Sequence, residues 1–235
     1  MSRAHFDTTL KFTVLCLVLA ACSHPDAQPA PHSPAELSAK TDEKARLADS
    51  VELLKAFQHV AAQPVLRRAR CVVLVPDLLS GGLIVGARRG HGFATCRVGD
   101  AWSAPAPLTI SGASFGPQIG VQSVDWMMLV MTDEGLKKML RAKLTLGADM
   151  SVSAGPVGKG KEIDTDTALK TEALSFSRSR GLFAGVDLNG AAVEQDIEAT
   201  TALYGQPVEF QRLLTGEVPT PLEAHELIAA VGETF

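Results

Sequence analysis

Residues 155–161 of this sequence have the spacing of a phosphate-binding loop. Gly155, Gly160 and Lys161 form the pattern G-x-x-x-x-G-K, in which backbone amides and a lysine would hold nucleotide phosphates. That chemistry requires a strand before the loop, a helix after it, and Ser or Thr behind the lysine to bind magnesium. Glu162 stands there instead, and the following residues show no clear apolar helix face. The pattern therefore predicts a loop between strands, and we expect no nucleotide to bind.

A second stretch, Gly112 to Gly116, has the G-x-S-x-G pattern of a hydrolase nucleophile. Ser114 would be the nucleophile, and His91 or His225 could serve as its base. In such hydrolases a helix follows the serine directly, but here Pro117 comes soon after it and the next residues are strand-like. The favoured interpretation is a serine in a turn between strands, and a serine esterase remains the third hypothesis for function.

The sequence predicts neither a metal nor a cofactor. It has no C-x-x-C or H-E-x-x-H motif, and Asp164 to Asp166 lack the remaining spacing of a calcium-binding loop. We therefore assign no catalytic and no metal-ligating residue.

Basic residues offer a different chemistry, because arginine can pair with a lipid phosphate through two hydrogen bonds. They occur in clusters: Lys44, Arg46 and Lys55; Arg67, Arg68 and Arg70; Arg88 and Arg89; Lys137, Lys138, Arg141 and Lys143. Taken singly, each cluster could equally be a solvated surface.

The N-terminus is typical of a bacterial lipoprotein precursor. A short basic region precedes an apolar run from Phe12 to Ala21, too short to span a membrane but suited to a secretory signal. The run ends in Leu19-Ala20-Ala21-Cys22, which resembles a lipobox and predicts cleavage before Cys22 and lipidation of that cysteine. Residues 1–21 are thus expected to be a signal peptide, and residues 22–40, rich in Pro and Ala, a lipidated tether. Ser23 behind the cysteine favours the outer membrane, facing the periplasm.

The charge balance excludes a general nucleic-acid binder. The chain has 22 basic and 26 acidic residues, a net charge of −4, whereas nucleic-acid binding needs a basic field. Any contact with anionic lipid must therefore come from a local basic patch.

Two cysteines, Cys71 and Cys96, remain in the expected domain, residues 41–235. In an oxidising envelope they could form a disulfide, but both lie in apolar, strand-like stretches where a free cysteine packs as a small core residue. Both interpretations stay open.

The periodicity predicts an α+β fold in which a curved, mainly antiparallel sheet, which could be barrel-like, is packed with several helices. A helix is expected over 41–60, capped by Thr41, with an apolar stripe of Leu47, Val51, Leu54 and Phe57. Short strands follow over 71–131, with Gly99-Asp100 as a turn, and a helix capped by Thr132 that carries Lys137 to Lys143. Strands return over 148–188, Asn189-Gly190 forms a turn, and residues 191–205, 207–216 and 220 onwards are expected to be helical, the last with a capping box at Thr220.

These pieces, in this order, resemble the SYLF lipid-binding domain family. The resemblance rests on LLKAF, GGLIVGARRGHGFATCR, AWSAPAPLTISGASFGPQIG, LGADMSVSAGPVG, SFSRSRGLFAGVDLNGAAVEQD and LYG, and covers nearly all of residues 41–205. It implies a non-enzymatic module that binds phospholipids, partly through a basic N-terminal helix, and some eukaryotic members also bind actin. Lys44, Arg46 and Lys55 occupy the matching helix, which has fewer lysines than the family pattern, and Phe176 stands where tyrosine is commoner.

We therefore expect a membrane-tethered lipoprotein that binds a phospholipid membrane without catalysis. Its candidate lipid-binding residues are Lys44, Arg46, Lys55, Arg88 and Arg89, and Cys22 is its lipid anchor. The alternative is a structural lipoprotein that contacts envelope proteins or peptidoglycan.

Overall fold

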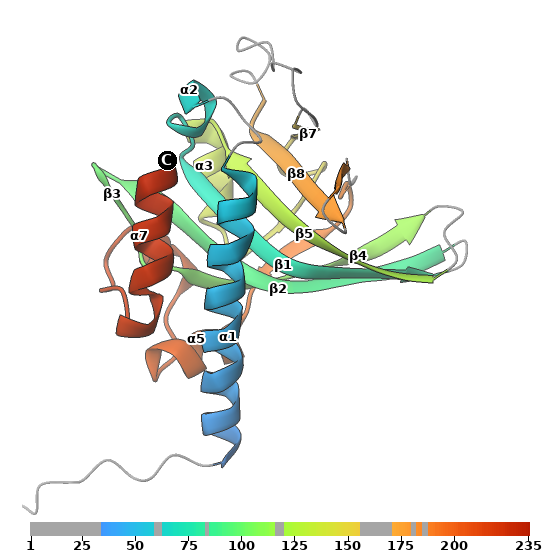
Figure 1. Cartoon of the computed structure of the whole chain (residues 1–235). Coiled ribbons are helices and arrows are strands. Elements are labelled where there is room, and N and C mark those ends of the chain that lie inside the picture. Colours follow the sequence, from blue (N-terminus) through green and yellow to red (C-terminus); the bar gives the residue numbers. More distant parts are fainter. Residues whose placement is uncertain are drawn as a thin grey trace, which may run out of the picture. The chain divides into compact units, whose positions relative to one another are not determined.

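Ten strands and several helices form the described part of this chain (Figure 1). The computed structural model describes residues 34–58, 63–82, 85–115, 120–155, 171–179, 182–184 and 188–235. These residues belong to one compact unit, Ser33–Phe235. Cys22 and the predicted signal peptide lie outside the described residues. Within them, no helix has the length and apolar character needed to cross a membrane.

The helices lie at the start, middle and end of the unit. They are α1 (Pro34–Phe57), α2 (Gln63–Leu66), α3 (Asp133–Met139), α5 (Ile197–Tyr204), α6 (Phe210–Leu214), the 3-10 helix η1 (Leu222–Ala224) and α7 (His225–Thr234).

The strands form one curled sheet that is antiparallel except for the β7–β8 pair. They are β1 (Cys71–Gly82), β2 (Val85–Val98), β3 (Ala101–Trp102), β4 (Ala106–Phe115), β5 (Gly120–Val130), β6 (Lys143–Thr145), β7 (Val152–Ala154), β8 (Ala173–Ser179), β9 (Leu182–Ala184) and β10 (Ala192–Gln195). Their order is β6-β10-β4-β2-β1-β5-β8-β7, with β3 beside β2 and β9 beside β8. This half-barrel packed with helices confirms the predicted α+β class.

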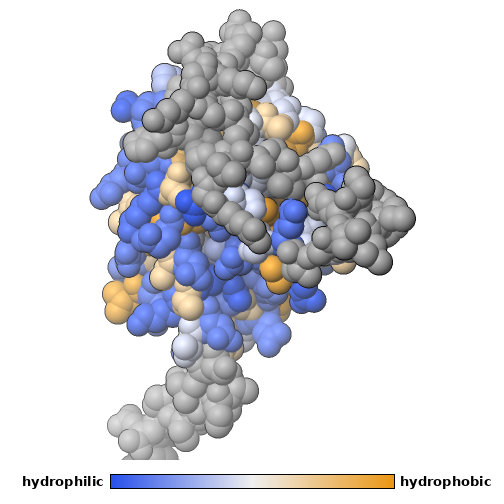
Figure 2. All heavy atoms as spheres, turned by 45° about the vertical axis from the view of Figure 1, so that its right-hand side comes forward, coloured by the Kyte–Doolittle hydropathy of each residue, from blue (hydrophilic) through white to orange (hydrophobic). Residues whose placement is uncertain are grey.

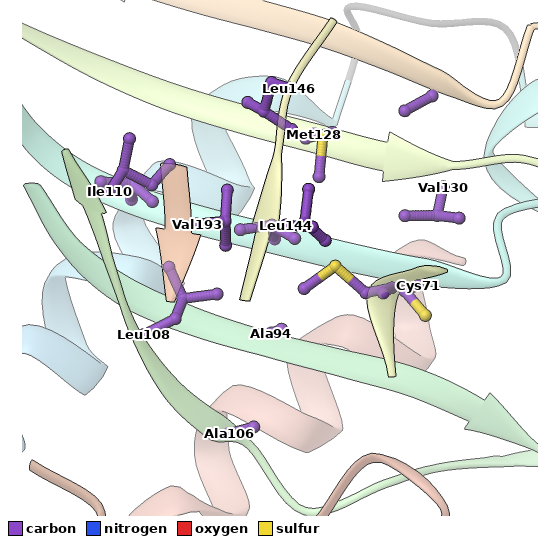
Figure 3. Close-up of a cluster of buried hydrophobic side chains, with 14 of the residues drawn as sticks. Cys71, Ala94, Ala106, Leu108, Ile110, Met128, Val130, Leu144, Leu146 and Val193 are labelled. Atoms are coloured by element: carbon purple, nitrogen blue, oxygen red, sulfur yellow. The ribbon is translucent and has the colours of Figure 1, made fainter. Parts of the chain in front are cut away.

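Each face of the sheet carries its own apolar core, because side chains alternate between the faces of a strand. On the inner face, residues of β1, β2, β4, β5, β6 and β10 meet, among them Leu108, Ile110 and Val193 (Figure 3). On the outer face, Phe93 of β2 packs with residues of α1 and α7. Both cores lie wholly within Ser33–Phe235, so we expect this segment to fold on its own.

The helix α1 confirms the predicted apolar stripe but not its start. Leu47, Val51, Leu54 and Phe57 are all buried. The helix begins at Pro34 rather than Thr41, because proline suits a first turn and the following residues are good helix formers. The last residues of the predicted tether are therefore helical.

The sheet bends at a bulge in β1. The pairing of β1 shifts register between Val75 and Leu78 against β5, and Asp77 takes a left-handed conformation with φ 54°. A bulge inserts an extra residue and increases the local twist. Gly92 of β2 allows the backbone of β1 to come close, since a Cβ there would lie 2.0 Å from the carbonyl oxygen of Leu74.

Cys71 and Cys96 form a disulfide between directly opposed positions of β1 and β2. This resolves the choice that the sequence left open. The bond closes a loop over a sequence separation of 25 residues on the inner face of the sheet.

Several local predictions hold and others are wrong. Thr132 caps α3 by accepting a hydrogen bond from the Gly135 amide, and Gly99-Asp100 and Asn189-Gly190 are turns. Residues 192–195, predicted to be helical, form β10 because they pair with both β4 and β6. Lys143 likewise lies in β6 and not on a helix. The predicted capping box fails: a 3-10 turn intervenes, α7 begins at His225, and no side chain caps either helix.

Candidate functional site

The three basic candidates of α1 do not form one patch. A helix turns about 100° per residue, so Lys44 and Lys55 lie about 20° apart on one flank and Arg46 lies on the opposite flank. The exposed surface between the flanks carries acidic residues, Asp42, Asp49 and Glu52. Lys55 is paired with Glu52 at 2.9 Å. The predicted basic face is therefore split in two.

Arg46 is committed to an ion pair inside the protein. Its Nη1 donates a hydrogen bond to Oε1 of Glu43, whose side chain is only 6% exposed. The other oxygen, Oε2, accepts no hydrogen bond from any described residue. Burial raises the pKa of Glu43, and the neighbouring Arg46 offsets part of this rise. Arg46 therefore stabilises a buried carboxylate as well as presenting charge at the surface.

A shallow groove between α1 and β2 brings two of the predicted candidates together. We call it the α1–β2 groove; it has a volume of about 430 Å³ and is lined by Asp42, Ala45, Arg46, Asp49, Pro76, Asp77, Leu79, Arg89, Gly90 and His91. Arg46 and Arg89 both line it, while Arg88, one residue before Arg89 on the strand, belongs to the inner face. Three carboxylates share the groove with these two guanidinium groups, which limits its attraction for anions.

Lys44 lines a separate hollow on the other flank of α1. That hollow lies against α5 and η1, where Glu223 and the buried Glu43 also contribute to its wall. Glu226 of α7 acts electrostatically on Lys55. This flank is thus less positive than its lysines suggest.

Beneath the groove, His91 and Asp196 join β2 to the start of α5. Nδ1 of His91 lies 3.0 Å from Oδ2 of Asp196, and Thr109 of β4 donates to the same oxygen at 3.3 Å. Oδ1 of Asp196 caps α5 by accepting a hydrogen bond from the Ala199 amide at 2.9 Å. The hydrogen bond from His91 is the main cause that lowers the pKa of Asp196 to about 2. No sequence motif indicated this pair, whose members are 105 residues apart.

The two motifs that resemble catalytic or nucleotide sites have different outcomes. Ser114 lies within β4, opposite Gly86 of β2, so the expected turn is wrong. The next described element is β5, which begins at Gly120, and not the helix that a hydrolase elbow requires. Of the phosphate-loop pattern, Gly155 packs where a Cβ would meet the Phe176 ring, and residues 156–170 lie outside the described residues. Among the described residues, no group of three or more His, Cys, Asp or Glu could hold a metal ion.

Sequence comparisons identify relatives of this chain. Residues 111–234, just over half of the chain, match the family described as Ysc84, Las17-binding protein actin regulator. "Protein YSC84" of Saccharomyces cerevisiae is 32% identical over 168 residues, covering 70% of this chain and 36% of that protein. "LAS seventeen-binding protein 3" of the same species is 31% identical over 195 residues, 80% of this chain and 42% of that protein. The human "SH3 domain-containing YSC84-like protein 1" is 31% identical over 167 residues, 69% of this chain and 48% of that protein.

This chain therefore spans less than half the length of these relatives, and the match concerns a domain that they share with it. The family is generally a non-catalytic binding domain. The matched region covers more than half of the chain, and the fold described above extends through it. The chain therefore belongs to the Ysc84 family, also called the SYLF domain family.

Proposed function

We propose that this protein is a non-enzymatic, phospholipid-binding lipoprotein that is attached to a membrane through lipid on Cys22. The observation that carries the proposal is the sequence Leu19-Ala20-Ala21-Cys22 ahead of a Ysc84/SYLF domain. Several acyl chains hold a protein stably on a bilayer, whereas one chain does so only marginally. The anchor would hold the domain at the membrane, where even a modest affinity for phospholipid sets its orientation.

The Cys71–Cys96 disulfide supports a location in the cell envelope. Disulfides persist in oxidising compartments such as the bacterial periplasm and are rare in the cytosol. The disulfide thus supports our proposal that the domain lies in the periplasm, tethered to the outer membrane, which is the membrane that Ser23 favours.

The lipid contact is local and lies on the flank of α1 that carries the α1–β2 groove. On the described surface visible in Figure 2, hydrophilic residues predominate and apolar residues occur as separate spots. The groove flank offers Arg89, with Arg46 and the half-exposed Leu79 beside it. The opposite flank pairs Lys55 with Glu52 and lies near Glu223 and Glu226.

The anchor is tested by replacing its sulfur. We expect Cys22→Ser in the full-length protein to leave an uncleaved or soluble product, because the oxygen cannot take the diacylglycerol that precedes cleavage. Membrane fractionation and labelling with a radioactive fatty acid measure the effect. Normal processing and unchanged membrane association of Cys22→Ser would contradict the lipoprotein assignment.

The lipid contact is tested by flotation of Ser33–Phe235, without the anchor, on vesicles of phosphatidylcholine with and without phosphatidylglycerol. We expect Arg89→Glu to weaken binding to the anionic vesicles about thirtyfold, since each charge near such a surface contributes about 1 kcal/mol and the reversal changes two. The matched control is Lys44→Glu/Lys55→Glu, which changes the net charge twice as much but on the opposite flank. We expect that control to lower the affinity about threefold at most, as a screened long-range effect.

A larger loss from the lysine pair than from Arg89→Glu would move the contact to the other flank of α1. No binding of the unchanged domain to any vesicle would favour the alternative, a structural lipoprotein that contacts envelope proteins or peptidoglycan.

A further inference from the structure

The end of the sheet formed by β4, β2, β1 and β5 projects beyond the helices (Figure 1). Two rows of directly opposed positions make up this end, which we call the sheet tip. The rows, in strand order, are Ala113-Ala87-Gly81-Val121 and Phe115-Val85. Both rows belong to the outer face by their position in the strands. Positions alternate between the two faces, and Val85 and Ala87 are an even number of positions away from Arg89 and His91, which line the groove against α1.

At the sheet tip the usual distribution of polar and apolar residues is reversed. Deeper in the sheet, the inner face carries an apolar core. Near the tip, the inner rows are instead polar or glycine: Gly112-Arg88-Ser80-Gln122 and Ser114-Gly86-Gly82-Gly120. The two outer rows of the tip contain only apolar residues and glycine. The reversal occurs in all four strands. It is a property of the sequence, because a shift of one residue in the polar and apolar pattern exchanges the faces on which the residues of a strand lie.

Apolar positions of the outer face are open to solvent at and behind the tip. Leu79, in the row behind the tip, is 50% exposed, and Ala87 and Ala113 are exposed. The helix α1 covers the outer face only as far as the groove, where His91 lies. The end of the outer face that α1 leaves uncovered thus presents Leu79, Ala87 and Ala113 to solvent.

A charged residue, Arg89, lies in the row directly behind the two apolar rows. The row directly behind the tip is Ser111-Arg89-Leu79-Ser123, so Arg89 lies about 13 Å along the strand from Val85, at about 3.3 Å per residue. Asp77, Asp42 and Asp49 lie in the groove at or behind this level. From the tip inward, the outer face is thus first apolar and then carries hydroxyl and guanidinium groups. In a segment that has entered a bilayer, the tip lies among the acyl chains and the next level lies at the phosphates, so the two orders match.

We propose that the sheet tip inserts its apolar outer face into the interface of a phospholipid bilayer, with Arg89 at the level of the phosphates. This inference rests on the proposed function and names the part of the domain that enters the lipid. Amphipathic helices that lie in this interface bury their apolar face about 5–10 Å deep, and the two outer rows of the tip can reach the same depth. The carboxylates of the groove oppose attraction by charge alone, so apolar insertion must supply much of the affinity.

A second copy of the chain is a poorer occupant. Four strands about 4.8 Å apart and four residues of rise give a face of roughly 250 Å² on each copy. Two such faces bury roughly 500 Å² together, whereas stable protein interfaces bury about 1,600 Å². A bilayer requires no such area of complementary shape.

The test compares two pairs of substitutions in Ser33–Phe235 on phosphatidylcholine vesicles with and without phosphatidylglycerol. Ala113→Asp/Val121→Asp places two charges on the outer face. The matched control, Ser114→Asp/Gln122→Asp, adds the same charges one residue further along the same two strands, and therefore on the inner face. We expect the outer pair to weaken binding at least tenfold on both kinds of vesicle, and the inner pair to change it about threefold or less, on anionic vesicles only.

A second measurement reports insertion directly and uses milder changes. Phe115→Trp places a fluorophore in the outermost row, and Gln122→Trp places one on the inner face; the native Trp102 and Trp126 are buried and give a constant background. We expect phosphatidylcholine brominated on its acyl chains to quench the tryptophan of Phe115→Trp and to leave that of Gln122→Trp unquenched.

Each result has a distinct consequence. Vesicle binding that survives Ala113→Asp/Val121→Asp, or a Phe115→Trp that binds without quenching, overturns insertion of the sheet tip but leaves phospholipid binding intact. Failure of the unchanged domain to bind any vesicle overturns the proposed function and this inference together.

Discussion

Gly92→Ala should unfold this domain or lower its free energy of unfolding by about 4 kcal/mol or more. A Cβ at this position would lie 2.0 Å from the carbonyl oxygen and 2.9 Å from the carbonyl carbon of Leu74. Both atoms belong to the backbone of β1, beside the bulge, and β1 pairs with both β2 and β5. The strand cannot move without breaking pairing at the centre of the sheet, so the strain cannot be relieved locally.

The effect can be measured by urea unfolding of Ser33–Phe235, followed by the fluorescence of the buried Trp126. Gly232→Ala is the matched control, because Gly232 lies in α7 and, outside its chain neighbours and its own helical turns, no described atom lies within 4 Å of the position of its new methyl group. There the same change should stabilise the domain by about 0.5–1 kcal/mol through helix propensity. A Gly92→Ala domain with nearly wild-type stability would show that β1 does not approach β2 this closely.

Arg46→Met should lower the free energy of unfolding at pH 7 by about 3 kcal/mol or more. The substitution leaves the carboxylate of Glu43 buried without its partner, and removing one member of a buried pair typically costs about 3–5 kcal/mol. Reversal of Lys44, Arg46 and Lys55 together to glutamate would therefore disturb folding as well as lipid binding.

The loss should depend on pH in a defined direction. Burial already raises the pKa of Glu43 above its ordinary 4.5, and without Arg46 it rises further. The cost of the ionised carboxylate is fully present above this raised folded-state pKa. It falls as the pH drops through that pKa, because the folded protein then takes up the proton before the unfolded chain does. Unfolding free energies of Arg46→Met should therefore approach those of the wild type as the pH is lowered from 7 towards 5.

The double variant Glu43→Met/Arg46→Met completes the test. Removing both charges leaves neither one unpaired, and such replacements are often neutral or stabilising. We expect the double variant to be more stable than Arg46→Met at pH 7. Equal stability of the two, or a loss in Arg46→Met that does not change with pH, would show that Glu43 is not the cause.

Local signals in the sequence were sufficient for most of the elements and for the fold class. The apolar stripe of α1, the Thr132 cap and the Asn189-Gly190 turn depend on residues within a few positions of one another, and each is present. The β10 strand was missed because its alanine, glutamate and glutamine favour a helix, and only pairing with β4 and β6 overrides that preference.

The candidate site was predictable only in part for the same reason. Arg89 and Arg46 were found as basic residues, but their meeting in one groove depends on how α1 packs on the sheet. The ion pair of Arg46 with Glu43 has a helical spacing that usually indicates a solvated surface pair. Its burial is decided by tertiary contacts of α1, and the link between His91 and Asp196 joins residues far apart in the sequence.

The arrangement of β6 and β7 has a consequence for crowding at a membrane. These two strands stand at the two ends of the strand order, and each has only 3 residues. The turn between them brings the edges towards each other, since Leu146 and Met150 form a parallel bridge, and the far part of β8 is covered by β9. Short, covered edges offer few unpaired amides and carbonyls on which another chain could add a strand. Among the described residues, the longer edges without a pairing strand are those of β4 and β5 at the sheet tip. A domain concentrated on a lipid surface by the proposed anchor therefore offers little at β6 and β7 for edge-to-edge pairing, which leaves the tip as the end where such pairing could occur.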